Sequence, residues 1–453
     1  MIPSTFAAAL IRLLHKQITT RMPPSRERLS SEPVEAKKRD GQPKNDLEVP
    51  TVNALLVYPE IPDTFWSFRY ALRFVGRKSA FPPLGLLTVA AMLPDSWDLR
   101  LADLNVKRLR QRDLAWADCV LISAMAIQRR SVHALVARCQ EAGVTTIAGG
   151  PLFTNEPDAF PEIDHLVLNE AEATLPRFLE DFANGKAAPR YAATEFPSLA
   201  ATPIPRWELV DLQCYGSMNV QYSRGCPFDC DFCNITSLFG RQPRVKQPDQ
   251  IIAELDSLRD NGWYGSVFFV DDNFIGNKKR LKDDLLPALV TWQSSHRHQP
   301  FNTEVSINLA DDQELMALMA AAGFDTVFVG IETPDEAGLK ECGKTQNRNR
   351  DLVADVKRIQ HAGMQVQGGF ILGFDGDTPS IFQRQIDFIQ ESGIVTAMVG
   401  LLEAIPGTRL HERLQREQRL VAGDTSGDNA DATTNIIPRM NQAVLQDGYK
   451  RVM

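Results

Sequence analysis

The sequence predicts an α/β protein with two parallel-sheet units, a doubly wound sheet followed by a partial (β/α)6 barrel. Three observations lead to this prediction. In the first half of the chain, short apolar strands alternate with helical segments, which is typical of a parallel sheet covered on both faces. A Pro-rich stretch at 196–205 then interrupts the pattern. After it, a helix, a small residue, a glycine and an apolar strand recur four times, as in a barrel.

The first unit carries small or polar residues where its expected strands end. Ligands of doubly wound sheets bind beyond the carboxyl ends of the strands, so these residues are candidates for a binding site. They are Asp103, Ser123, Gly149, Gly150 and Glu170. The expected strands cover 52–57, 99–102, 119–122, 144–148 and 165–168.

The second unit is organised by its recurring glycines. A glycine suits the end of a helix because the chain must turn there in a left-handed conformation. Six strands are expected, and a complete eight-unit barrel typically needs about 250 residues, so a partial barrel is predicted. The expected strands cover 219–222, 267–270, 304–307, 326–329, 365–371 and 395–399.

Composition sets the remaining limits. The net charge of −8 does not resemble the basic footprint of a nucleic-acid binder. No apolar run approaches the roughly 20 residues of a membrane span. Seven cysteines, three of them within eight positions, argue against a disulfide framework and favour the reducing cytoplasm. Residues 1–50 are expected to form a disordered extension, because 23–50 is polar and rich in Pro, Ser, Glu and Lys. The alternative for its start is a membrane-surface helix at 4–17.

The main chemical motif is Cys226-Pro-Phe-Asp-Cys230-Asp-Phe-Cys233, in a loop directly after a strand. Thiolates are the usual ligands of iron–sulfur clusters. Three thiolates on a four-iron cluster leave one iron open to a small molecule, as in an open metal site. Two alternatives are a structural zinc site with Cys214 as fourth ligand, and cysteines that only pack in the interior.

This CxxxCxΦC pattern, with Phe232 before the last cysteine and Ser223-Arg224-Gly225 before the first, resembles the signature of radical S-adenosylmethionine (SAM) enzymes. The resemblance implies a [4Fe-4S] cluster whose open iron is chelated by SAM. It also implies an electron donor such as flavodoxin or ferredoxin, and a 5′-deoxyadenosyl radical that abstracts hydrogen from carbon. The positions that match the family's SAM contacts are Phe232, Asp271, Asp272, Glu304, Ser306, Gly330, Glu332 and Gly373.

The first unit is similar to the cobalamin-binding domain of one radical SAM class. The matching text includes Tyr58-Pro59, Asp103-Leu104-Asn105 and Gly149-Gly150-Pro151. Asn105 stands where many cobalamin proteins carry a histidine, so the resemblance implies no histidine ligand to cobalt. The cobalamin contacts that it implies are Asp103, Asn105, Ser123, Gly149, Gly150 and Glu170. The expected domains are 51–195 for cobalamin, 196–212 as a linker, 213–412 for the radical SAM barrel, and a C-terminal segment at 413–453.

The chain resembles more closely one cobalamin-dependent subfamily, which includes the hopanoid C-2 methylases. The segments that carry this resemblance are 58–67, 82–88, 103–106 and 435–440. It implies a C-methyltransferase that acts on an unactivated carbon of a small-molecule or lipid substrate. One SAM would methylate cob(I)alamin and another would yield the radical. No general acid or base is expected, because such a C–H bond is not acidic. A hopanoid substrate implies peripheral contact with a membrane.

Two alternatives remain at this point. One is another cobalamin-dependent radical SAM reaction, such as ring formation or oxidation. The other is a truncated, non-catalytic paralogue that binds cobalamin or a cluster, since relatives continue into a longer helical C-terminal region than 413–453.

Overall fold

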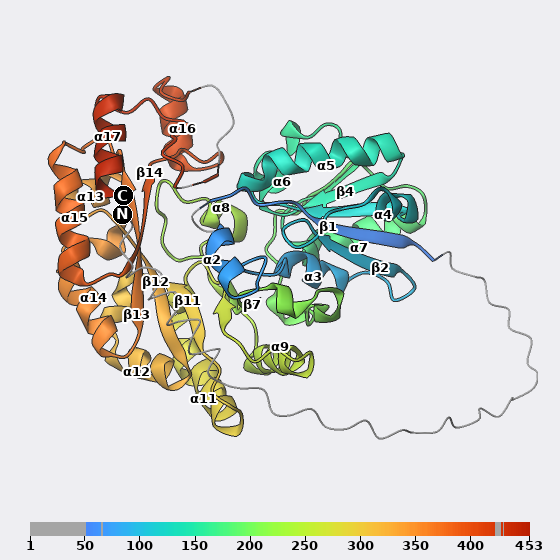
Figure 1. Ribbon diagram of the computed structural model, residues 1–453, viewed down its shortest axis with the longest axis horizontal. Helices are drawn as coiled ribbons and strands as arrows, with labels where there is room; N and C mark the ends of the chain where they lie inside the picture. The colour runs from blue at the N-terminus through green and yellow to red at the C-terminus, as the bar shows by residue number, and fades with distance from the viewer. Residues whose placement is uncertain (1–50, 65–66, 422–426, 429) are drawn as a thin grey trace, which may run out of the picture.

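The computed structural model describes residues 51–64, 67–421, 427–428 and 430–453; the expected N-terminal extension lies outside them. The first half of the chain forms a six-stranded parallel sheet with strand order β2-β1-β3-β4-β5-β6 (Figure 1). The order reverses between β1 and β3, which places the usual ligand crevice at their carboxyl ends. The strands are β1 (Asn53–Tyr58), β2 (Asp98–Asp103), β3 (Cys119–Ser123), β4 (Thr145–Gly149), β5 (His165–Val167) and β6 (Arg190–Tyr191).

Helices cover both faces of this sheet because its strands are apolar on both sides. Leu56 and Leu121 belong to one buried cluster, while their neighbours Leu55 and Val120 belong to another. Each cluster is completed by helices on its own face, as a doubly wound sheet requires. The first face is covered by α3 (Leu84–Ala90) and α7 (Ala171–Ala183), the second by α4 (Gln111–Trp116), α5 (Arg129–Ala142) and α6 (Pro151–Asn155).

The second half forms another six-stranded parallel sheet, with order β14-β13-β12-β11-β10-β7. Its strands curve side by side with an arc of helices on their outer face, as in a partial barrel (Figure 1). The α/β prediction of two consecutive parallel-sheet units is therefore confirmed. The strands are β7 (Met218–Val220), β10 (Val267–Phe269), β11 (Phe301–Val305), β12 (Phe324–Glu332), β13 (Gln365–Leu372) and β14 (Thr396–Leu401).

The strand boundaries differ from the predicted ones by up to three residues. β11 ends at Val305, so Ser306 and Ile307 lie beyond it. Ser306 is the N-cap residue of a 3-10 helix (Ile307–Asp311), and the strand ends where this helix begins. The outer helices are α9 (Pro248–Asp260), α11 (Leu286–Ser295), α12 (Gln313–Ala321), α14 (Leu352–His361) and α15 (Ser380–Ser392), with α16 (Arg409–Arg416) and α17 (Gln442–Val452) following β14.

The two sheets share one apolar core. Trp207 and Tyr215, from the segment between the sheets, are fully buried in the cluster that also contains Leu56 and Val220. The Tyr215 hydroxyl donates a hydrogen bond to Asp103 Oδ2 at 2.9 Å. Tyr215 also forms a parallel bridge with Ser79. The segment between the sheets is therefore part of the packed interior.

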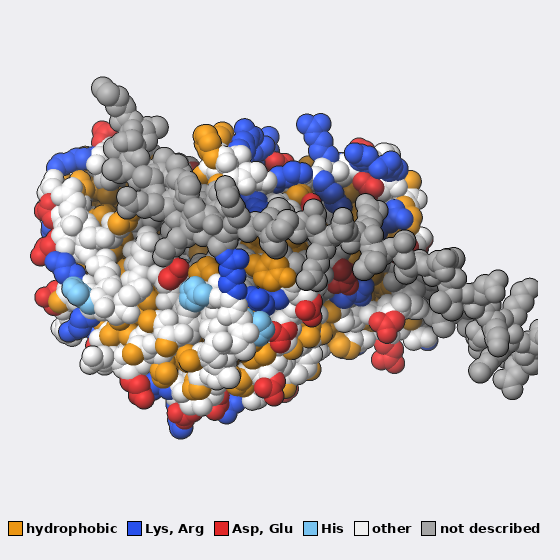
Figure 2. All heavy atoms as spheres, turned by 60° about the horizontal axis from the view of Figure 1, so that its bottom comes forward, with side chains coloured by type: hydrophobic (Ala, Val, Ile, Leu, Met, Phe, Trp, Pro, Cys, Tyr) orange, Lys and Arg blue, Asp and Glu red, His pale blue; other side chains and the backbone are white. Residues whose placement is uncertain are grey.

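No helix in the described part of the chain is long and apolar enough to cross a membrane. On the face shown in Figure 2, acidic and basic side chains lie among hydrophobic ones.

We predict that Tyr215→Phe destabilises the protein. The change removes a hydrogen bond to the buried Asp103 carboxylate, and its loss costs about 1–3 kcal/mol. Urea denaturation measures the free energy of unfolding. The control is Tyr264→Phe, at a side chain that is 59% exposed, which should stay within about 0.5 kcal/mol of the wild type. Equal stability of the two variants would contradict the role of Tyr215.

Candidate functional site

The three cysteines lie in the loop of a short hairpin formed by β8 (Ser223–Arg224) and β9 (Arg244–Val245). Gly225 begins the loop with φ of 96°. A Cβ atom there would lie 2.9 Å from the carbonyl oxygen of Gly240, so only glycine fits. Gly240 O also accepts a hydrogen bond from Cys226 N at 3.2 Å. The loop is thus closed tightly at its base, and α8 (Ile235–Phe239) follows the last cysteine.

Each thiol has a nearby hydrogen-bond donor. Asn273 Nδ2 lies 3.8 Å from Cys226 Sγ, and Gln346 Nε2 lies 3.9 Å from Cys230 Sγ. The backbone N–H of Ile235 faces Cys233, whose thiol pKa is raised by burial to about 12. A free thiol with this pKa stays protonated at neutral pH, whereas a metal would bind it as a thiolate. Hydrogen bonds donated to sulfur are among the features that set the reduction potential of iron–sulfur clusters.

The sulfur atoms do not converge on a single point. In the part of the chain that the structure describes, no three His, Cys, Asp or Glu side chains are grouped to hold one metal ion. A mononuclear zinc site requires such convergence. A four-iron cluster does not, because each thiolate binds a different iron. Cys214, the alternative fourth ligand, is buried and contacts Asp211 Oδ2 at 3.4 Å.

Carboxylates from the ends of β10 and β11 lie behind the cysteine loop. Asp271 is fully buried and accepts hydrogen bonds from Tyr222 N at 3.1 Å and Ser223 Oγ at 2.5 Å. It therefore fixes the start of the hairpin. Burial and the adjacent Asp271 raise the pKa of Asp272 to about 7. Burial, with Asp272 and Asp271 nearby, raises the pKa of Glu304 to about 8.

These acids fit a cationic ligand. Asp272 Oδ2 is buried and has no hydrogen-bond partner among the described residues. An unpaired buried carboxylate oxygen is costly unless a donor or a positive charge meets it. The amino and sulfonium groups of SAM supply positive charge, so the donor set here suits that cofactor.

Lys344 is a buried positive charge beside the cysteines. Its Nζ donates to Glu332 Oε1 at 2.6 Å and lies 6.0 Å from the centre of the Phe232 ring. Its charge also acts on Cys230 and Cys233, lowering the pKa of each thiol against the larger effect of burial. At Gly330, a Cβ would lie 2.7 Å from this ammonium group. A side chain at Gly330 would therefore displace the ends of the Lys344 and Glu332 side chains.

Ser306 and Gly373 have well-defined local roles. Ser306 N donates to Asn273 Oδ1 at 3.1 Å, so Asn273 links the end of β11 to Cys226. Gly373 has φ of 102°, and its N–H donates to Asp377 Oδ2 at 2.8 Å. A Cβ at Gly373 would contact Leu445 of α17, so this turn lies against the C-terminal helix.

The sequence did not single out Asn273, Lys344 and Gln346. Asn273 directly follows Asp271 and Asp272. Its position next to these two expected SAM contacts was the signal that the sequence offered. Lys344 and Gln346 lie in the segment after α13 (Glu336–Glu341), which carries no periodic or motif signal. Only the fold brings them beside the cysteines.

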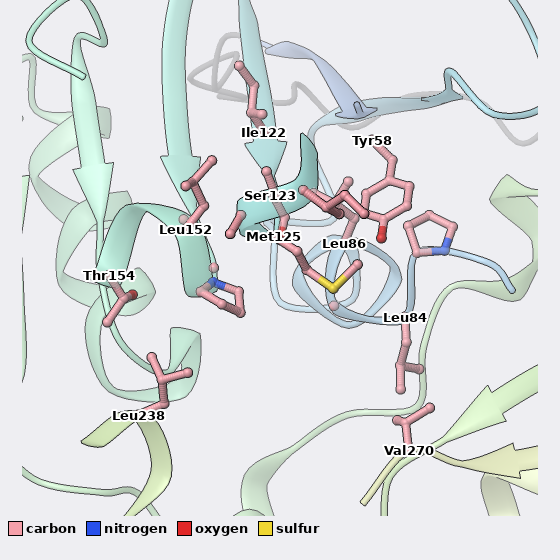
Figure 3. A pocket seen from close by; sticks show the side chains of 18 of the residues that line it. Tyr58, Leu84, Leu86, Ile122, Ser123, Met125, Leu152, Thr154, Leu238 and Val270 are labelled. Atoms are coloured by element: carbon pink, nitrogen blue, oxygen red, sulfur yellow. The ribbon is translucent and has the colours of Figure 1, made fainter. Parts of the chain in front are cut away.

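A cavity of about 960 Å³ lies between the strand ends of the two sheets. Figure 3 shows side chains of the first sheet, such as Ile122 and Met125, on one side and Leu238 and Val270 on the other. A volume of this size holds a large ligand. Its wall includes five of the six expected cobalamin contacts and one expected SAM contact, namely Asn105, Ser123, Gly149, Gly150, Glu170 and Asp272.

The glycines at the end of β4 allow neighbouring segments of the same chain to approach closely. At Gly150, with φ of 95°, a Cβ would lie 2.7 Å from Ser123 Oγ. At Gly149, it would lie 2.6 Å from the carbonyl oxygen of Val167. A side chain at Gly149 would therefore clash with this backbone oxygen and displace the end of β4.

Asp103 and Asn105 brace the loops beside the cavity. Asp103 is buried and absent from the cavity wall. It accepts hydrogen bonds from Asn105 N at 2.9 Å and from Asn105 Nδ2 at 2.8 Å. Asn105 Oδ1 in turn accepts from Ile61 N at 2.8 Å. The amide of Asn105 is therefore occupied by the loops after β1 and β2.

Glu170 is held in an ion-pair network between the two halves of the molecule. Arg244 donates to both of its oxygens, at 2.7 and 3.0 Å, and Arg224 Nη1 lies 2.6 Å from Oε2. Arg224 also forms two bonds of 3.0 Å with Glu172. All four side chains are largely buried. Arg224 is two residues from Cys226, so the network connects the first sheet to the cysteine loop.

Comparison with known proteins identifies both halves. Residues 74–179 match the B12 binding domain, 220–389 the Radical SAM superfamily, and 408–453 a domain of unknown function. An uncharacterized methyltransferase of Synechocystis sp. is 46% identical over 85% of this chain and 73% of its own length. The hopanoid C-2 methylase of Rhodopseudomonas palustris is 40% identical over 83% of this chain and 72% of its own length.

Solved structures agree on the fold. The radical SAM methyltransferase TsrM from Kitasatospora setae, with cobalamin and a [4Fe-4S] cluster bound, has a TM-score of 0.65 over 81% of this chain and 78% of its own, at 17% identity. The cobalamin-dependent enzyme OxsB, with aqua-cobalamin and SAM bound, has a TM-score of 0.67 over 88% of this chain and 66% of its own, at 14% identity.

The chain thus has the two-domain arrangement of the cobalamin-dependent radical SAM enzymes. It belongs to the family of methyltransferases that contains the hopanoid C-2 methylase. The resemblance seen in the sequence is confirmed, together with the cofactors of that family: a [4Fe-4S] cluster, SAM and cobalamin.

We predict that Arg224→Met weakens the contact between the two halves. The change leaves the buried Glu172 carboxylate without its ion pair, at a cost of about 3–5 kcal/mol. Burial acts to raise the pKa of Glu172, but the hydrogen bonds and charge of Arg224, together with the hydrogen bond from Thr202, lower it below its ordinary value. This stabilisation is present above the unfolded-state pKa and is lost as the pH falls through the folded-state value. Urea denaturation at neutral and acidic pH measures both effects.

The matched control is Arg190→Met. Arg190 pairs with Asp158, but the two side chains are 47% and 89% exposed, so the expected loss is below about 1 kcal/mol. If Arg224→Met were no more destabilising than this control, the network would not hold the halves together.

Proposed function

We propose that this enzyme methylates an unactivated carbon of a hopanoid-type, polycyclic apolar lipid. The observation that carries the proposal is the 40% identity to a hopanoid C-2 methylase over 83% of the chain. The apolar cavity wall supports it, because a hydrocarbon ring system needs such a surface (Figure 3). The apolar members of that wall include Leu84, Leu86, Ile122, Met125, Leu152, Leu238 and Val270.

We propose that Cys226, Cys230 and Cys233 bind the cluster. The support is their place in one closed loop, each beside a hydrogen-bond donor. When bound, the cluster, SAM and cobalamin supply the electron, the radical and the methyl group of the family's reaction. Asp272 and Glu304 would meet the positive charge of SAM.

The remaining expected contacts divide into two sets. Around SAM, Asp271 and Ser306 would hold the strand ends in place, and Phe232, Gly330, Glu332 and Gly373 would shape the neighbouring wall. Around cobalamin, Ser123, Gly149 and Gly150 would allow close approach at the sheet edge. Asp103, Asn105 and Glu170 would act by fixing the surrounding loops. No acid or base is assigned, since hydrogen abstraction needs none.

We also propose where the protein works. A reduced cluster requires a reducing compartment, so we assign the enzyme to the cytoplasm with flavodoxin or ferredoxin as electron donor. A hopanoid resides in membranes, so the enzyme would reach it by peripheral contact with the membrane surface.

We predict that Cys230→Ala abolishes the four-iron absorbance after anaerobic reconstitution with iron and sulfide, because the cluster loses one of its three ligands. Cys139→Ala is the control. That thiol is fully buried in the first sheet's core, away from the cysteine loop, so its loss should leave the spectrum unchanged. A normal four-iron spectrum in Cys230→Ala would overturn the ligand assignment.

We predict that the reconstituted enzyme, given cobalamin, SAM and reductant, forms 5′-deoxyadenosine and adds a methyl group to a hopanoid. Mass spectrometry detects both products. Absence of 5′-deoxyadenosine from a sample whose cluster is spectrally intact would contradict the catalytic proposal. Formation of 5′-deoxyadenosine with methylation of a different lipid and none of hopanoid would reject the substrate alone.

A further inference from the structure

A short helix beside the cavity, α2 (Arg69–Phe74), presents aromatic side chains to solvent. Phe74 is 90% exposed and Tyr70 is 67% exposed. Phe74 has the highest exposure of any large hydrophobic residue in the described part of the chain. Exposed aromatic residues in a group mark an interaction surface more often than isolated apolar residues do.

The helix is held firmly in this orientation. Leu72 is buried, with Cδ2 2.9 Å from the position of a Cβ at Gly216, so the opposite face packs closely on the segment between the sheets. After the helix, Lys78 N donates to Cys214 O at 2.8 Å, and Arg77 Nη1 donates to Gln213 Oε1 at 2.9 Å. The exposure of Tyr70 and Phe74 therefore follows from the fold.

The same segment is basic within an acidic protein. Residues 69–78 contain four basic residues and no acidic one, whereas the whole chain has a net charge of −8. Arg69 pairs with Asp63 at 2.7 Å, but Arg73 has no ion-pair partner among the described residues. Its guanidinium lies 5.7 Å from the centre of the Tyr70 ring, so charge and aromatic surface stand side by side.

The helix also borders the cavity. Ser67 and Arg69 at its beginning and Lys78 just after its end contribute to the cavity wall, while Arg73 and Phe74 do not. One face of the segment thus reaches the site and the other reaches solvent.

We propose that α2 is a membrane-docking surface, which places the cavity mouth against an anionic lipid bilayer. Aromatic side chains favour the headgroup region, and adjacent arginines and lysines are attracted by anionic lipids. The choice of a membrane over a protein partner rests on the proposed lipid substrate. A substrate that enters from the bilayer would then pass α2 to reach the cavity.

Sedimentation of the full chain with vesicles tests this proposal. Vesicles with equal parts phosphatidylglycerol and phosphatidylcholine should bind the wild type more tightly than pure phosphatidylcholine vesicles, and added salt should weaken the binding. Phe74→Ser should weaken it at least about tenfold, and Arg73→Ala about fivefold. Val395→Ser is the control, because Val395 is 58% exposed but lies just before β14, at the opposite end of the strands.

Failure of the wild type to bind anionic vesicles would overturn the proposal, as would equal binding by Phe74→Ser. Binding of an acidic protein through Phe74 without vesicle binding would overturn it too. A methylation assay tests the substrate proposal separately. If vesicle binding depends on Phe74 but no hopanoid is methylated, docking is supported and only the substrate proposal fails. If vesicle binding depends on Phe74 and hopanoid is methylated, Phe74→Ser should slow methylation of vesicle-embedded hopanoid but not of detergent-dispersed hopanoid.

Discussion

The buried ion pairs between the two halves are the constraint on which the site depends. Glu170 and Glu172 begin the helix after β5, and Arg224 and Arg244 lie at the two ends of the cysteine loop. Bidentate arginine–carboxylate pairs fix orientation as well as distance. The loop that carries the cysteines is therefore held against the cobalamin-binding half. A reaction that needs cofactors in both halves depends on that fixed separation.

A second principle is the balance of charge around the cysteines. Asp271, Asp272 and Glu304 lie at the ends of neighbouring strands near the three thiols, and the buried Lys344 is a positive charge that acts on Glu304, Cys230 and Cys233. Burial and the neighbouring carboxylates raise the pKa of Asp272 and Glu304, against smaller opposing effects of Arg224 and Lys344. A pocket of this kind is complete only when a cation enters it, which agrees with the charge of SAM.

The cavity lies between the two sheets, and both of them form its wall. Each sheet presents the carboxyl ends of its strands, and the space of about 960 Å³ between them is bordered by both. A substrate in that space faces the cobalamin half on one side and the radical SAM half on the other. The aromatic and basic surface of α2 lies beside the same space, so an apolar substrate would need only a short path from a bilayer.

The sequence by itself determined the parallel-sheet class, the order of the two units and the cysteine motif, because strand periodicity, helix-ending glycines and motif spacing are local properties. It also pointed to the strand-end residues, since topology places them at one edge. Only the tertiary structure decided that Glu170 pairs with Arg224, that Asp103 is a buried brace, and that Lys344 lies beside the cysteines. The two hydrogen bonds join residues 54 and 112 positions apart, and Lys344 comes 111 positions after Cys233, so no local pattern specifies these contacts.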